Sequence, residues 1–396
     1  MEFCCKFYGS IEFKVILFGL LLSFLVVNGV KSDCNYFQHL EPGQTYYAYN
    51  SEFPSTYKGE NHCIWKMESS TVTTISCSIQ MKYDCQNNRL TIQFYGGRSY
   101  ILCGSNNTFD LQGINPIITF NSQYNSEGRF LCKIQISNDW NKNCQCGWKK
   151  ETRIVGGKET GINEYPMMSG LVDAAKQIIF CGGTIISKQY VITAAHCIHN
   201  KYIPNIGVIV GEHDTATGSE TKATKLFRVE TCYIHPNYQS NTVANNDVAV
   251  CKIYGTITFN AEVGPACLPF RYGQYSFANN IVTALGWGLL EFGGSKPTKL
   301  QKVDLNVITR EKCQNYYPNV GNQNLCTFTS GKDTCQMDSG GPLLWQDPKT
   351  HNIVVVGITS TGSGCASNTP AVAMCLGYFI NWIIYVTPDA QYCQID

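Results

Sequence analysis

Short runs in which apolar and polar residues alternate make up most of residues 33–136. Examples are TVTTISCSIQM at 71–81, LTIQFYG at 90–96 and PIITF at 116–120. β-Branched and aromatic residues dominate these runs, and Gly, Asn and Ser separate them, as in short strands that bury one face. The pattern predicts a β-sandwich or barrel over residues 33–136.

Residues 154–396 show the same short strands and Gly-containing turns, over a length that one all-β domain can have. Near the end, FINWIIYV at 379–386 predicts a helix that packs on a core. Residues 137–153 are polar and have no apolar period, so we interpret them as a linker. The predicted fold class is therefore all-β, with two successive domains.

A thirteen-residue apolar run, VILFGLLLSFLVV, follows Lys14 near the amino terminus. It is too short to span a bilayer and fits the core of a signal peptide. Residues 1–32 are therefore predicted to be a signal peptide, and an uncleaved anchor is the less favoured alternative. We expect a secreted, extracellular protein.

The composition narrows the class of protein further. The chain has 21 cysteines among 396 residues, which fits a disulfide-bonded secreted protein. Zinc binding is the competing explanation, but most cysteines stand singly and not in C-x-x-C pairs. Thirty basic against 29 acidic residues leave a net charge of +1, so no basic excess is available to bind nucleic acid.

Three polar residues in the second half have the types and order of a hydrolytic triad. His196 follows the apolar run VITAA, Asp247 precedes the buried run VAVCKI, and Ser339 lies in CQMDSGGP. A serine hydroxyl needs a neutral imidazole to take its proton, and the imidazole needs a carboxylate to fix its tautomer. Each residue alone is more often structural, but the order His, Asp, Ser is one of the known triad orders.

The motifs around these residues resemble the chymotrypsin-like (trypsin) family of serine proteases. In chain order they are IVGG at 154–157, CGGTIIS at 181–187, TAAHC at 193–197, GWG at 286–288 and DSGGP at 338–342. The resemblance implies two antiparallel barrels with the site between them. It also implies His196 as general base, Asp247 as its orienting acid and Ser339 as nucleophile.

The resemblance further implies a zymogen. Cleavage after Arg153 would free the amino group of Ile154, which in the family enters the protein and pairs with the acid before the nucleophile, here Asp338. The backbone N–H groups of Met337 and Ser339 would form the oxyanion hole. The family usually has Gly where this chain has Met337, and losing one such donor costs about 10²–10³ in turnover.

The primary pocket implied by the family has an acid at its base. Asp333 lies six residues before the nucleophile, which implies cleavage after Arg or Lys. Ser360, Gly362 and Ala371 would form the pocket walls. Ala371 replaces a common Gly, and its methyl group should narrow the slot, so we expect arginine to be preferred to lysine.

Disulfide pairs follow from the resemblance in the same way. The expected pairs are Cys181 with Cys197, Cys313 with Cys326, and Cys335 with Cys365. Cys267 is expected to hold the pro-segment through Cys144 or Cys146, while Cys232, Cys251, Cys375 and Cys393 have no expected partner. Because 19 cysteines remain after signal removal, one is predicted to be free or to pair with another chain.

Residues 33–136 resemble a CUB domain, a binding module, mainly through their cysteine rhythm. The acid that a calcium-binding member has after the late F-x-S is Gln123 here. Asn106, in NNT, is an N-x-T sequon on the predicted surface. In the second domain, Glu212 and Glu220 bound a loop that holds an ion in some relatives, but the altered spacing favours a solvated acidic loop.

The leading interpretation is a secreted, trypsin-like serine endopeptidase made as a zymogen. Its domains are a signal peptide at 1–32, a CUB-like sandwich at 33–136, a linker with the activation site at 137–153 and a protease domain at 154–396. We expect protein or peptide substrates, an activating protease and a ligand of the CUB-like domain, with no cofactor, metal, nucleic acid or membrane. The alternative is a catalytically weakened homologue that binds partners through the front domain.

Overall fold

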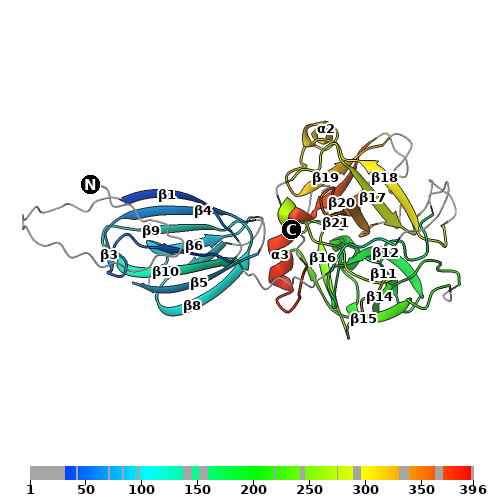
Figure 1. Cartoon of the computed structure of the whole chain (residues 1–396), viewed down its shortest axis with the longest axis horizontal. Helices are drawn as coiled ribbons and strands as arrows, with labels where there is room; N and C mark the ends of the chain where they lie inside the picture. The colour runs from blue at the N-terminus through cyan, green and yellow to red at the C-terminus, as the bar shows by residue number, and fades with distance from the viewer. Residues whose placement is uncertain are drawn as a thin grey trace, which may run out of the picture. The chain divides into compact units, whose positions relative to one another are not determined.

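The computed structural model describes residues 32–41, 43–69, 72–82, 84–95, 99–136, 145–150, 159–217, 220–240, 246–273, 275–288, 296–329, 339–361 and 369–393. The chain divides into two compact units, Met1–Asp139 and Trp140–Asp396. Both are built mainly of strands (Figure 1), as the alternating pattern predicts.

The first unit contains two facing β-sheets. One has the order β1-β4-β9-β6-β7, and the other has the order β2-β10-β5-β8 with β3 beside β10 (Figure 1). The strands are β1 (Ser32–His39), β2 (Thr45–Tyr49), β3 (Tyr57–Lys58), β4 (Asn61–Glu68), β5 (Thr73–Met81), β6 (Asn88–Gln93), β7 (Ser99–Leu102), β8 (Ser105–Gly113), β9 (Ile117–Ser122) and β10 (Glu127–Ile136).

The core of this unit lies between the sheets. Alternate residues of β5 and β10 are buried, because successive side chains of a strand point to opposite faces. Trp65 and Phe120 of the first sheet meet Phe130 of the second, with ring centroids 5.9 and 4.9 Å apart. The six cysteines of this region form three disulfides, Cys34–Cys63, Cys77–Cys132 and Cys85–Cys103.

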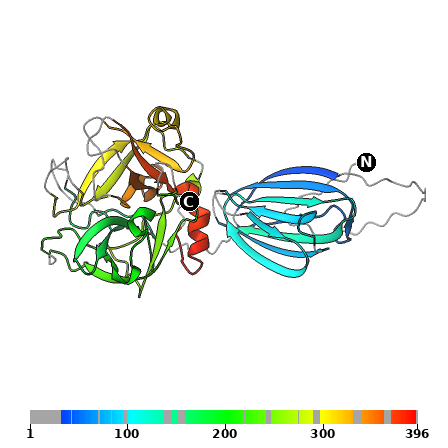
Figure 2. The same cartoon turned by 180° about the vertical axis from the view of Figure 1, so that it is seen from behind.

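The second unit holds a closed six-stranded barrel followed by a six-stranded sheet. The barrel has the order β11-β12-β13-β16-β15-β14 and the sheet β18-β17-β20-β21-β22-β19; Figure 2 shows the barrel in green and the sheet in yellow to red. The barrel strands are β11 (Met168–Asp173), β12 (Ile178–Ile185), β13 (Tyr190–Thr193), β14 (Ile206–Val210), β15 (Lys225–Ile234) and β16 (Ala249–Ile253). The sheet strands are β17 (Ile281–Gly286), β18 (Gln301–Asn306), β19 (Asn324–Thr327), β20 (Pro342–Gln346), β21 (Ile353–Thr361) and β22 (Ala371–Cys375).

Helices are few and short in this unit. They are α1 (Ala195–Ile198), α2 (Arg310–Gln314), α3 (Leu376–Val386), η1 (Ile203–Asn205) and η2 (Phe270–Tyr272). The helix predicted at 379–386 is α3, which begins three residues earlier and buries most of its side chains. No helix in the described part of the chain has the length and apolar character needed to cross a membrane.

Candidate active site

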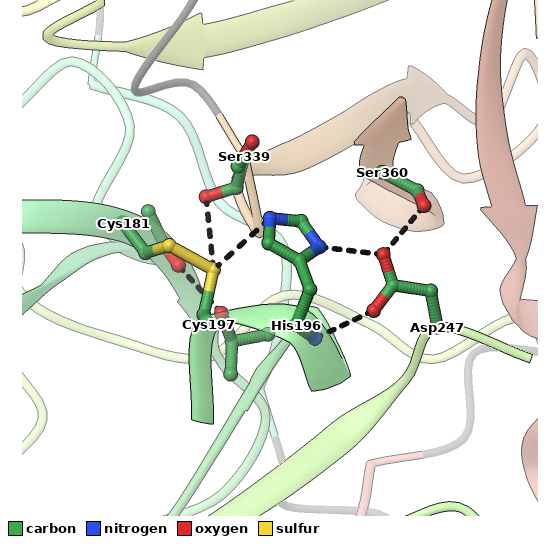
Figure 3. Close-up of a disulfide and its surroundings, with 8 residues drawn as sticks. Cys181, His196, Cys197, Asp247, Ser339 and Ser360 are labelled. Atoms are coloured by element: carbon green, nitrogen blue, oxygen red, sulfur yellow. Dashed lines mark hydrogen bonds and ion pairs between the residues drawn. A yellow bond between two sulfur atoms is a disulfide. The ribbon is translucent and has the colours of Figure 1, made fainter. Parts of the chain in front are cut away.

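His196 and Asp247 meet at one end of the barrel (Figure 3). His196 lies on α1, directly after β13, and Asp247 lies two residues before β16, which pairs with β13. Asp247 Oδ2 is 2.6 Å from His196 Nδ1, and Asp247 Oδ1 accepts a hydrogen bond of 2.8 Å from the His196 backbone N–H. The carboxylate thus holds both the ring and the backbone of the histidine.

The Asp247 carboxylate stays ionised although it is only 2% exposed. Burial alone would raise its pKa, but hydrogen bonds and charge attraction from His196, with a further bond from Ser360, hold the pKa below its ordinary value. The Ser360 hydroxyl donates to Asp247 Oδ2 at 2.5 Å. A buried carboxylate with these partners fixes Nδ1 as the donor, which leaves Nε2 free to accept a proton.

Ser339 lies next to the Nε2 edge of the His196 ring (Figure 3). Both His196 Nε2 and the Ser339 carbonyl oxygen are 3.7 Å from Cys197 Sγ. Although both residues are described, the structure has no hydrogen bond between Ser339 Oγ and His196 Nε2. Such bonds are often long without substrate and tighten only in the complex. The three residues that the sequence groups as a triad therefore gather in one place.

A disulfide borders this site. Cys181 of β12 is bonded to Cys197, next to His196. Together with His196 these cysteines form the only group in the described ranges with the spacing of a metal site. Sulfur atoms joined in a disulfide are not thiolates and cannot bind a metal as thiolates do. The disulfide instead links β12 to α1, the helix that carries His196.

The expected specificity pocket is only partly within the described residues. Ser360 is buried at the end of β21, and Ala371 is buried at the start of β22. Asp333, Met337, Asp338 and Gly362 lie outside the described residues. The sequence did not indicate that the Ser360 hydroxyl donates a hydrogen bond to the Asp247 carboxylate.

Arg153 and Ile154 also lie outside the described residues, but 145–150 of the segment before them is described. Cys146 is bonded to Cys267, which selects one of the two partners left open by the sequence. Gly147 accepts a hydrogen bond from Ile353 N at 2.7 Å and donates to Pro265 O at 2.7 Å. The segment is thus fixed to the rest of the second unit by a disulfide and by backbone hydrogen bonds.

Lys149 of this segment contacts a buried carboxylate. Its Nζ is 3.0 Å from Oε1 of Glu164, whose side chain is only 3% exposed, and Lys302 Nζ is 2.8 Å from the same oxygen. Burial would raise the pKa of Glu164, but Lys302, the Gly161 N–H and Lys149 lower it overall. Nothing in the local sequence pattern indicated this cluster, because its members are far apart along the chain.

The Glu212–Glu220 loop differs from the expected solvated loop. Glu212 is 7% exposed, and it shares a hydrogen bond with Glu220. Burial, that hydrogen bond and the neighbouring charges raise the pKa of Glu212 to about 7. Burial also opposes ionisation of Glu220, but hydrogen bonds from Thr217 and the Asp214 N–H lower its pKa to about 2. These opposite pKa shifts favour one proton shared by the two carboxyl groups.

Comparison with known proteins agrees with this geometry. The family model described as Trypsin matches residues 154–383. "Venom serine protease 34" of Apis mellifera is 40% identical over 98% of this chain and 94% of its own length. "Venom serine protease" of Polistes dominula is 43% identical over 67% of this chain and 97% of its own length. The chain belongs to the trypsin family of serine proteases.

The match spans His196, Asp247 and Ser339, and it ends within α3 of the protease. A third relative, "CLIP domain-containing serine protease HP8" of Bombyx mori, is 34% identical over 60% of this chain and 70% of its own length. The protease has the barrel and six-stranded sheet described above, and the relative from Apis mellifera also matches the β-rich region that precedes them.

Most of the other described cysteines of the protease also form disulfides. Cys313 is bonded to Cys326, while the expected partners Cys335 and Cys365 lie outside the described residues. Two further cysteines, for which no partner was expected, are paired as Cys232–Cys251. Cys393 is disulfide-bonded too, and Cys375 is a free, buried thiol.

Proposed function

We propose that this chain is the precursor of a secreted serine endopeptidase that cleaves peptide bonds after Arg or Lys. The observation that carries the proposal is the buried Asp247 carboxylate bonded to His196 Nδ1 at 2.6 Å, with Nε2 on the side of Ser339. A carboxylate in this position supports general-base catalysis by the ring. Membership of the trypsin family supports the same chemistry.

In the proposed reaction Ser339 Oγ bonds to the carbonyl carbon of the scissile peptide while His196 Nε2 takes the hydroxyl proton. Asp247 stabilises the imidazolium that results. The imidazolium then gives its proton to the departing amine as the carbon–nitrogen bond breaks, which leaves an acyl group on Ser339. Water, deprotonated by the same ring, releases the acid and restores the serine. The N–H groups of Met337 and Ser339 are the proposed donors to the oxyanion.

Activation and specificity belong to the same proposal. Cleavage after Arg153 would free Ile154 to pair with Asp338, and Asp333 would bind the cationic side chain at the base of the pocket. The Cys146–Cys267 disulfide would keep the front unit attached to the cleaved enzyme. We propose a signal peptide at 1–32, a CUB-like binding module at 33–136 and a glycan on Asn106, whose strand β8 lies in the first unit.

The many disulfides and the two relatives named as venom proteases support secretion of this chain into an extracellular fluid. Protein substrates and an activating protease follow from the family. A ligand for the front unit is part of the proposal because CUB-like modules bind partners.

A fluorophosphonate probe tests the chemistry. The purified full chain is cleaved with immobilised trypsin, and amino-terminal sequencing verifies Ile154 as the new terminus. We expect the probe on the Ser339 peptide only after cleavage, no label in Ser339→Ala, and cleavage of a denatured protein digest after Arg and Lys. A correctly cleaved chain without label would refute the proposal and favour the weakened, partner-binding homologue.

A further inference from the structure

The backbone around the candidate nucleophile is held from both halves of the second unit. The Ser339 carbonyl accepts a hydrogen bond of 2.9 Å from Gly182 N on β12, which belongs to the barrel. Gly340 N donates to Thr359 O at 2.8 Å on β21, which belongs to the six-stranded sheet. The position of Ser339 relative to His196 therefore depends on where β12 places Gly182.

Gly182 of β12 packs so closely against residues 339–341 that neither Gly182 nor Gly340 has room for a side chain. A methyl group on Gly182 would lie 2.7 Å from Gly341 Cα. Gly340 has a φ of +79°, and a methyl group there would lie 2.7 Å from Gly182 O and 2.2 Å from Thr193 Oγ1. The Thr193 hydroxyl thus occupies the space that the missing side chain of Gly340 leaves open.

Thr193 connects this contact to the histidine. It is the last residue of β13, is fully buried and lies three residues before His196. Its hydroxyl donates to Gly182 O at 2.8 Å. Gly182 carries both the N–H that donates to the Ser339 carbonyl and the carbonyl that accepts from Thr193. The Thr193 hydroxyl therefore fixes the residue that holds Ser339.

We propose that Thr193 is a positioning residue for the nucleophile. Its hydroxyl holds Gly182, and Gly182 holds the Ser339 carbonyl, so that Ser339 stays beside the Nε2 edge of His196. This inference rests on the proposed function, because it takes Ser339 as the nucleophile and His196 as the base. A small error in such an alignment is costly, since a shift of about 1 Å can reduce turnover by about 10²-fold.

Thr193→Val tests the inference in the cleaved full-length enzyme with an arginyl amide substrate. Valine has nearly the shape of threonine but lacks the donor. We expect kcat to fall by about tenfold to hundredfold, with KM changed less than about twofold, because the substrate-binding surface is untouched. The rate of fluorophosphonate labelling at Ser339 should fall by the same factor. Thr193→Ser keeps the hydroxyl and should restore kcat to within about threefold.

Thr184→Val is the matched control. Thr184 lies on the same strand as Gly182 and is fully buried, but its hydroxyl has no hydrogen-bond partner among the described residues. We expect wild-type kcat for this variant. Equal losses in Thr184→Val and Thr193→Val would show a general packing effect and overturn the inference. Thr193→Ala removes the donor without adding bulk, so it provides the same comparison should the valine variant not fold.

Ser339→Ala distinguishes a failure of the role of Thr193 from a failure of the proposed function. If Ser339→Ala abolishes turnover while Thr193→Val and Thr193→Ala keep wild-type kcat, only the role of Thr193 is refuted. If Ser339→Ala keeps full activity, the proposed function itself is wrong.

Discussion

The carboxyl pair Glu212 and Glu220 predicts an unusual dependence of stability on pH. The pKa of Glu212 is raised from an ordinary 4.5 to about 7, and the pKa of Glu220 is lowered to about 2. A group with a raised pKa binds its proton more tightly in the folded protein. Its stabilising contribution is therefore complete below pH 4.5 and is lost as the pH rises to 7. Glu220 contributes in the opposite sense, above pH 4.5, and loses its contribution as the pH falls to 2.

The magnitude for Glu212 follows from the shift. Each pKa unit corresponds to about 1.4 kcal/mol, so the shared proton stabilises the folded chain by at most about 3 kcal/mol at pH 4.5 to 5. This contribution disappears by about pH 8. Glu212→Gln replaces the acid with a neutral amide that still donates to Glu220. The variant should keep its stability as the pH rises from 5 to 8.

Urea denaturation at a series of pH values measures the effect, with tryptophan fluorescence as the signal. The inactive Ser339→Ala chain avoids self-digestion, and a chelator prevents cations from replacing the shared proton. Glu230→Gln on β15 is the control, because Glu230 is exposed. The difference between Glu212→Gln and the parent should grow by up to about 3 kcal/mol from pH 5 to pH 8. Parallel curves for these two proteins would refute the shared proton.

Four shorter predictions test other parts of the structure. Asp247→Asn should reduce kcat by about 10⁴-fold, a magnitude carried over from triads of this kind; near-normal turnover of an arginyl amide would contradict the role of the acid. The cleaved chain should run as one band without reductant and as two with it, because Cys146 and Cys267 are bonded; two bands in both lanes would be inconsistent with that tether. Ala371→Gly should lower the ratio of kcat/KM for arginyl over lysyl substrates, and an unchanged ratio would show that the methyl group does not narrow the pocket. Cys375 should resist a thiol reagent until the chain unfolds, because burial raises the pKa of its thiol to about 11; mass spectrometry of a native sample with Cys375 modified would disprove this.

Much of the fold follows from local patterns in the sequence. The alternating run at 71–81 contains β5, and the apolar run at 379–386 lies within α3. The strand pattern can be recognised because burial of one face imposes a period of two on a strand. The first residue of α3 is harder to predict from the sequence. β22 is buried along its whole length and leads directly into the helix, with no polar residue to separate them.

Local sequence patterns predict some features of the candidate site and its surroundings but not others. His196, Asp247 and Ser339 carry their own motifs, so their types and order point to one chemistry before any geometry is known. The Cys232–Cys251 bond and the contact of Glu164 with Lys302 carry no such signal. The cysteines meet because the register of β15 against β16 places them directly opposite each other. Register is set by the whole barrel and not by the residues around either cysteine.

Residues 145–150 show that a polar segment without periodicity need not be a flexible connection. Consecutive residues here make contacts of different kinds, namely a disulfide, backbone hydrogen bonds, ring packing and ion pairs, so no repeating apolar face develops. Cys146 is bonded to Cys267, and Lys149 pairs with buried Glu164. The ring of Trp148 lies where a side chain on Gly264 would have to be. The disulfide, the ion pair and the ring packing fix the backbone at nearly every residue. A flexible connection would not need contacts at such close intervals. The structural unit that carries the candidate site therefore includes residues well before Ile154.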